Sequence, residues 1–204
     1  MSGCCNHGDS LALLRERQRG TLHVVFAINA VMFFIIVAAA WAAHSSALLA
    51  DSLDNFGDAF TYAISLYAVA RGRRTKARVA LLKGGLILLA AAVVAAQIVY
   101  RLFVPATPVF ELMGAFSLVA LAANATCLFL LMRHRDDDVN MNSVWECSRN
   151  DIVANLSVFA AAAAVWATGS AWPDLLVAGL LVLFLLRSAL RVMARAGREL
   201  RQSA

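Results

Sequence analysis

The chain has 204 residues, of which 61% are hydrophobic and 15% are charged. Soluble domains carry about 45–50% apolar and about 25% charged residues, and a soluble globule of this size could not bury so much apolar surface. The composition therefore indicates an integral membrane protein. It also excludes a secreted disulfide scaffold, which would need more than the 4 Cys present in a shorter chain.

Long runs without Asp, Glu, Lys or Arg predict the membrane spans. Each is close to, or longer than, the ~20 residues that a helix needs to cross a bilayer. The runs are Gly20–Ala50, Gly84–Tyr100, Leu112–Met132 and Ile152–Pro173. Two further apolar segments carry a few charges. The chain is thus predicted to be an all-α integral membrane protein whose transmembrane helices cover about residues 22–43, 47–70, 79–102, 109–132, 142–167 and 173–194.

The basic residues gather at alternate helix ends, and the opposite ends carry only Arg101. Because Lys and Arg favour the cytoplasmic side, we expect both termini to be cytoplasmic. The expected location is the cell membrane, such as a bacterial inner membrane, with lipid as a partner. This asymmetry accounts for the net charge of +5 and argues against nucleic-acid binding.

The expected organisation is a single transmembrane domain between two short cytoplasmic tails. The tails cover residues 1–20 and 196–204, and the domain covers residues 21–195. Arg recurs at helical spacing after residue 190, so we expect the sixth helix to continue beyond the membrane, where it contacts lipid headgroups.

Three acids stand inside the second predicted helix. Asp51, Asp54 and Asp58 are at i, i+3 and i+7, which places them on one face. An Asp near the bilayer centre costs about 2.5–3.5 kcal/mol, and three together repel. We therefore expect them to face a cation, a cavity or protons. The alternative is that they cap the helix or pair with Lys at the membrane edge.

The fifth predicted helix carries a matching face. Cys147 and Asp151 are at i and i+4, and Asn155 follows one turn later. Asp151 could instead pair with Arg149, and Cys147 could be a small packing residue.

The two faces together predict a metal site. Asp54, Asp58 and Asp151 with the thiolate of Cys147 make a set of three oxygen ligands and one sulfur ligand. This set suits zinc, tolerates cadmium and cobalt, and does not suit magnesium. We expect Asp51 and Asn155 to support the ligands. A carboxylate-rich site deep in a membrane favours transport over a structural role.

The stretch from His44 to Asp58 resembles the second-helix signature of the cation diffusion facilitator metal transporters. In that family a His or Asp lies four residues before an Asp, and a further Asp precedes the first by three. Asp54 and Asp58 match the ligand pair, and Asp51 matches the preceding Asp. The fifth-helix signature appears as Cys147-Ser-Arg-Asn-Asp151, with Cys147 where the family usually has His.

The resemblance implies a homodimeric exporter that exchanges zinc-like cations for protons, with no enzyme activity and no cofactor beyond the transported ion. The chain ends soon after the sixth predicted helix, so it is most similar to the truncated subgroup without the C-terminal cytoplasmic domain. Two alternatives stay open. One is a proton-coupled transporter of another cationic substrate, and the other is a membrane sensor or partner that binds metal without transporting it.

A second group of soft ligands lies near the N-terminus, at Cys4, Cys5, His7 and Asp9. Its spacing matches no standard zinc motif. The group either captures metal on the cytoplasmic side or belongs to a disordered tail.

Overall fold

The computed structural model describes residues 6–68, 73–133 and 139–202, which form six helices and no strand. The helices are α1 (Asn6–Ala43), α2 (Ser46–Ala68), α3 (Arg73–Phe103), α4 (Phe110–Met132), α5 (Val139–Thr168) and α6 (Trp172–Gln202). All six predicted helices are confirmed. The largest difference is α1, which begins at Asn6 rather than near residue 22. The helix expected to continue beyond residue 194 does so, as far as Gln202.

Five of these described helices are long and apolar enough to cross a membrane. The exception is α2, because every stretch of membrane-spanning length in it contains Asp51, Asp54 and Asp58. The helix that would be costly to insert alone is therefore the one that carries the acids.

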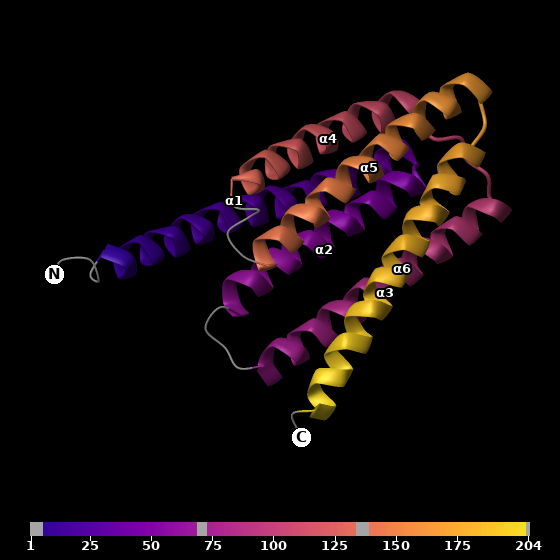
Figure 1. The fold of residues 1–204 in the computed structure, drawn as a ribbon. Coiled ribbons are helices and arrows are strands. Elements are labelled where there is room, and N and C mark those ends of the chain that lie inside the picture. Colours follow the sequence, from indigo (N-terminus) through magenta and orange to yellow (C-terminus); the bar gives the residue numbers. More distant parts are fainter. Residues whose placement is uncertain (1–5, 69–72, 134–138, 203–204) are drawn as a thin grey trace.

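In the bundle, α2 has the central position. It packs against α1, α3, α5 and α6, while α4 bridges α1 and α5 (Figure 1). α3 and α6 run side by side as a pair and diverge from the other four helices toward the end where the C-terminus lies (Figure 1). A central position lets neighbouring helices shield the acids of α2 from lipid.

Small residues allow close packing at the end of the bundle that holds the α1–α2 turn. The cluster there is rich in alanine from five helices, including Ala43, Ala47, Ala120, Ala161 and Ala178. Such residues let helix backbones approach closely in a membrane. At the opposite end, bulkier side chains fill the space between α1, α2 and α4, namely Leu22, Val25, Tyr62, Cys127 and Leu131.

The turn between α1 and α2 is very short. His44 has a φ of 53°, in the left-handed region, and it reverses the chain so that α2 begins at Ser46. The N–H of Val109, just before α4, donates to the Ala43 carbonyl at 2.9 Å. α1 and α2 are therefore antiparallel neighbours.

Candidate cation site

One face of α2 forms a buried polar stripe. Asp51, Asn55, Asp58 and Tyr62 recur at helical spacing, and each is at most 4% exposed. Asp54 is half-buried and lies beside this stripe. The acids thus face the protein interior rather than lipid, which is what the insertion cost of a membrane acid requires.

α5 presents a second polar stripe. Ser148, Asp151 and Asn155 are all at most 4% exposed, and Val158 continues the same face as apolar packing. Since α2 and α5 pack against one another, these two stripes enclose a polar interior within the membrane-spanning part of the bundle.

Asp58 and Asp151 meet where the stripes face each other. Their side chains share a hydrogen bond, and Asp151 is also within electrostatic range of Asp54 and Asp51. A hydrogen bond between two carboxyl groups needs one proton between them. Four mutually repelling acids therefore require protons or a cation for charge balance.

The amide side chains beside the acids leave acceptor oxygens without partners. Asn55 Nδ2 donates to the Asp51 carbonyl at 3.2 Å, and Asn155 Nδ2 donates to the Asp151 carbonyl at 2.9 Å. Each amide group therefore donates to a carbonyl of its own helix. The Oδ1 atoms of both amides and Oδ2 of Asp51 are buried and have no hydrogen-bond partner. Buried acceptors without donors are the arrangement that a cation or water would satisfy.

Within the described residues, no three or more His, Cys, Asp and Glu side chains come together closely enough to hold a metal ion. The structure thus brings Asp58 and Asp151 into contact. Asp54 and Asp51 interact with Asp151 electrostatically, without a hydrogen bond to it. The side chain of Cys147 lies outside the described part of the structure. The four-ligand set of the sequence analysis stays a prediction.

The N-terminal soft ligands are placed only in part. Cys4 and Cys5 lie outside the described residues, and His7 and Asp9 fall within α1, where their side chains are not described. The interpretation of this group as a metal-capture segment stays a prediction.

Sequence reasoning missed several polar residues of the interior. Asn55 and Ser148 could have been found, because they recur at helical spacing with the acids. Cys127 of α4 is also buried and within electrostatic range of Asp58, but a single Cys in an apolar helix gives no pattern in the sequence.

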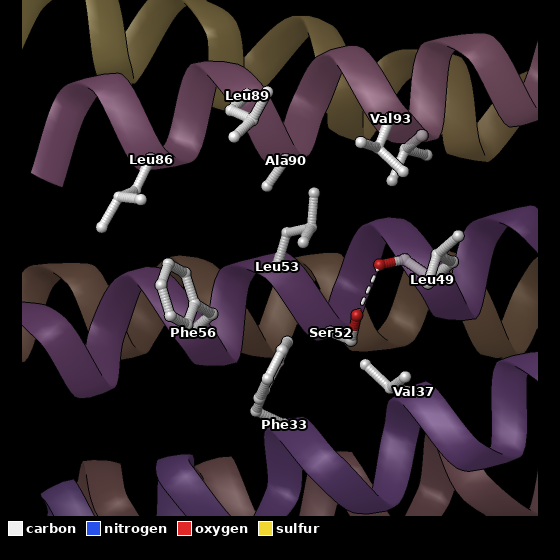
Figure 2. A pocket seen from close by; sticks show the side chains of 11 residues that line it. Phe33, Val37, Leu49, Ser52, Leu53, Phe56, Leu86, Leu89, Ala90 and Val93 are labelled. Carbon is white, nitrogen blue, oxygen red and sulfur yellow. Dashed lines mark hydrogen bonds between the residues drawn. The ribbon is translucent and has the colours of Figure 1, made fainter.

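An apolar cavity beside α2 is not a cation site. It measures about 360 Å³, with Phe33 and Val37 of α1, Leu53 and Phe56 of α2, and Leu89 of α3 among its lining residues (Figure 2). The polar side chain on its wall is Ser52, whose hydroxyl donates to the Leu49 carbonyl at 2.6 Å. A smaller cavity between α1 and α2 is lined by phenylalanine and alanine, and the described linings of both contain no acid.

A bundle of long apolar helices with buried acids on its central helix is the architecture of a polytopic membrane protein. Residues 22–200 match the model of the cation efflux transmembrane domain, and the chain belongs to this family. No curated protein matches the chain. Membership of the family confirms the predicted resemblance and indicates membrane transport of cations.

Proposed function

We propose that this protein exports a divalent transition-metal cation, zinc first and cadmium or cobalt as alternatives, in exchange for protons. The observation that carries the proposal is the Asp58–Asp151 hydrogen bond between the buried stripes of α2 and α5. Two carboxyl groups that share a proton inside a membrane can release it when a divalent cation takes its place.

The choice of metal rests on the ligand types. Asp54, Asp58 and Asp151 supply oxygen, and Cys147 is expected to supply sulfur from the same helix as Asp151. Mixed oxygen and sulfur ligands favour a borderline-soft ion such as zinc over magnesium or calcium. The buried amide oxygens of Asn55 and Asn155 offer neutral acceptors around the ion.

Coupling follows from competition for the same groups. A proton and a metal ion cannot occupy one carboxylate oxygen together, so each displaces the other. Alternating access would come from rocking the diverging α3–α6 pair against the other four helices around the fixed site. We further propose that the protein works as a homodimer in the cell membrane, as the family resemblance implies.

The two alternatives have less support. An organic cation would need aromatic side chains beside the acids, whereas Phe33 and Phe56 line cavities whose described linings contain no acid. A sensor that binds metal only through its N-terminal segment would leave the buried acids of α2 and α5 without a role.

The test is zinc uptake into proteoliposomes with an imposed proton gradient. Wild type should accumulate zinc when the compartment it enters is acidic, and Asp58→Ala should abolish this uptake. Glu111→Gln is the matched control, because Glu111 is an exposed acid at the start of α4. Equal uptake by wild type and Asp58→Ala would refute the proposal.

A further inference from the structure

A buried thiol on α4 lies near Asp58. Cys127 of α4 is 1% exposed and packs with Val25 of α1 and Tyr62 of α2. Asp58 is within electrostatic range of this thiol. Cys127 therefore lies where α1, α2 and α4 meet. Of these three helices, only α2 contributes to the site described above.

The side chain of Asn29 accompanies this thiol. Asn29 is 1% exposed, and its Nδ2 donates to the Val25 carbonyl at 2.9 Å and to Cys127 Sγ at 3.6 Å. Its Oδ1 is buried and has no hydrogen-bond partner. The amide nitrogen contacts the thiol, and the amide oxygen has no partner. Asn29 thus places a hard oxygen ligand near the soft sulfur of Cys127.

Asp58 interacts with residues of both α5 and α4. It shares a hydrogen bond with Asp151 of α5, and the hydroxyl of Tyr62, one turn along α2, donates to Asp58 Oδ2 at 3.4 Å. The same carboxyl group is electrostatically coupled to Cys127. A cation could thus keep Asp58 as a ligand while its other ligands change from Asp151 to Cys127.

We propose that Cys127, Asn29 and Asp58 form a second cation position, selective for soft divalent ions, at the junction of α1, α2 and α4. The thiolate sulfur, the amide oxygen and one carboxylate oxygen are its protein ligands. Only two of them are among His, Cys, Asp and Glu, so the position is consistent with the lack of larger ligand groups in the described chain. Binding breaks the S–H bond, forms a metal–sulfur bond and releases one proton to solvent.

This proposal rests on the proposed function and adds a reason for metal preference. Thiolate binds cadmium and zinc far better than it binds hard ions. The position also lies toward the apolar residues Val25 and Leu131, which fill one end of the α1–α2–α4 interior. An ion held there would be one transfer step from the Asp58–Asp151 pair.

The test uses the full-length chain with Cys4, Cys5 and Cys147 replaced by Ser, which leaves Cys127 as the remaining cysteine. Cadmium is added, and the ultraviolet charge-transfer absorption of the cadmium–thiolate bond is recorded. We expect a band that saturates at one ion per chain and disappears in Cys127→Ala. Asn29→Leu, which removes only the amide ligand, should weaken cadmium binding about tenfold.

A moved thiol provides the matched control. Ala120 is fully buried on the same face of α4, two turns from Cys127. Cys127→Ala combined with Ala120→Cys keeps a buried cysteine on α4 but separates it from Asn29, so the band should stay absent. The proposal is overturned if the single-cysteine chain shows no band, or if Asn29→Leu or the moved thiol leaves the band and affinity unchanged.

Calorimetric zinc binding to the wild-type chain separates this proposal from the proposed function. If wild type binds zinc but the cadmium–thiolate band is missing, only the second position is refuted. If wild type binds no zinc at all, the proposed function fails as well.

Discussion

Ser45 Oγ donates a 2.6 Å hydrogen bond to Asp174 Oδ1, although 129 positions separate the two residues in sequence. The same carboxylate accepts from the backbone N–H groups of Ser46 at 2.8 Å and Ala47 at 3.0 Å. Asp174 at the start of α6 therefore caps the N-terminus of α2. The three hydrogen bonds hold the acid-bearing helix to α6 at one end of the bundle.

Asp174→Ala should destabilise the fold without removing a metal ligand. Charge-assisted hydrogen bonds and helix caps each contribute about 1–2 kcal/mol, and the variant leaves buried donors at the start of α2 unpaired. We expect a lower thermal unfolding midpoint in detergent. Zinc affinity, measured calorimetrically below that midpoint, should stay within about threefold of wild type.

Asp174→Asn is the informative control, since an amide keeps one acceptor oxygen but loses the charge. Its unfolding midpoint should fall between those of wild type and Asp174→Ala. An unchanged midpoint in both variants would show that the cap does not hold α2 in place.

The helices could be predicted from the sequence because hydrophobic length decides where a chain crosses a membrane. The extension of α1 back to Asn6 was not predictable in this way, since charged and polar side chains leave no long apolar run in residues 6–20. Once a span is helical, each further residue adds one hydrogen bond at low cost. The helix can therefore continue into a polar segment.

The residues of the candidate site could be predicted from the sequence only where polar residues recur at helical spacing. Asp58 and Asp151 belong to repeating polar faces, and the structure brings them together. Asp174 gave no such pattern, because its partners lie on another helix and only the folded bundle creates the contact. Cys127 could not be predicted as a ligand for a related reason. A single Cys in an apolar helix has the same local sequence whether its side chain only packs against neighbours or also binds a metal ion.

Gly84 should be less tolerant of substitution than its neighbour Gly85. A Cβ on Gly84 would collide with the Met193 side chain of α6, whereas a Cβ on Gly85 would meet nothing within 4 Å. Gly84→Ala should therefore disturb the α3–α6 pair and lower the thermal unfolding midpoint. Gly85→Ala should leave the midpoint unchanged or raise it, because Ala favours a helix by about 1 kcal/mol. Equal effects of the two substitutions would contradict this packing.

Topology can be tested by labelling single cysteines with a membrane-impermeant reagent. Residues 106 and 170 lie in the connections after α3 and after α5, and should be labelled from outside the cell. Residues 75 and 137 should be labelled only from the cytoplasmic side. The reverse pattern would place both termini outside and overturn the orientation inferred from the basic residues.

The predicted ligands can be separated by their effects on transport. Removing the carboxylate of Asp54, Asp58 or Asp151 should reduce zinc uptake by at least about tenfold, since a lost buried ligand costs more than 1.4 kcal/mol. Cys147→Ser should weaken binding and shift preference away from cadmium, because a hydroxyl is a harder ligand than a thiolate. An unchanged zinc-to-cadmium ratio would assign Cys147 to packing instead.

The last prediction concerns the coupling of metal transport to protons. Under the proposed function, metal and protons compete for the carboxyl groups of Asp54, Asp58 and Asp151, which interact between α2 and α5. As pH falls, more of these groups hold a proton, so each bound zinc must displace more protons and its apparent affinity must fall. Zinc titrations across a pH series should therefore show a steep loss of affinity on the acid side.

The direction of transport follows from the same competition. In inside-out vesicles, an acidic lumen protonates the site on the luminal side, which favours release of the metal there, while the neutral medium favours loading outside. Such vesicles should accumulate zinc only while the lumen is acidic, and a protonophore should stop the accumulation at once. Zinc binding that is flat with pH, together with uptake that ignores the proton gradient, would leave a facilitated channel as the better explanation, because a channel needs no exchange between metal and protons at a shared site.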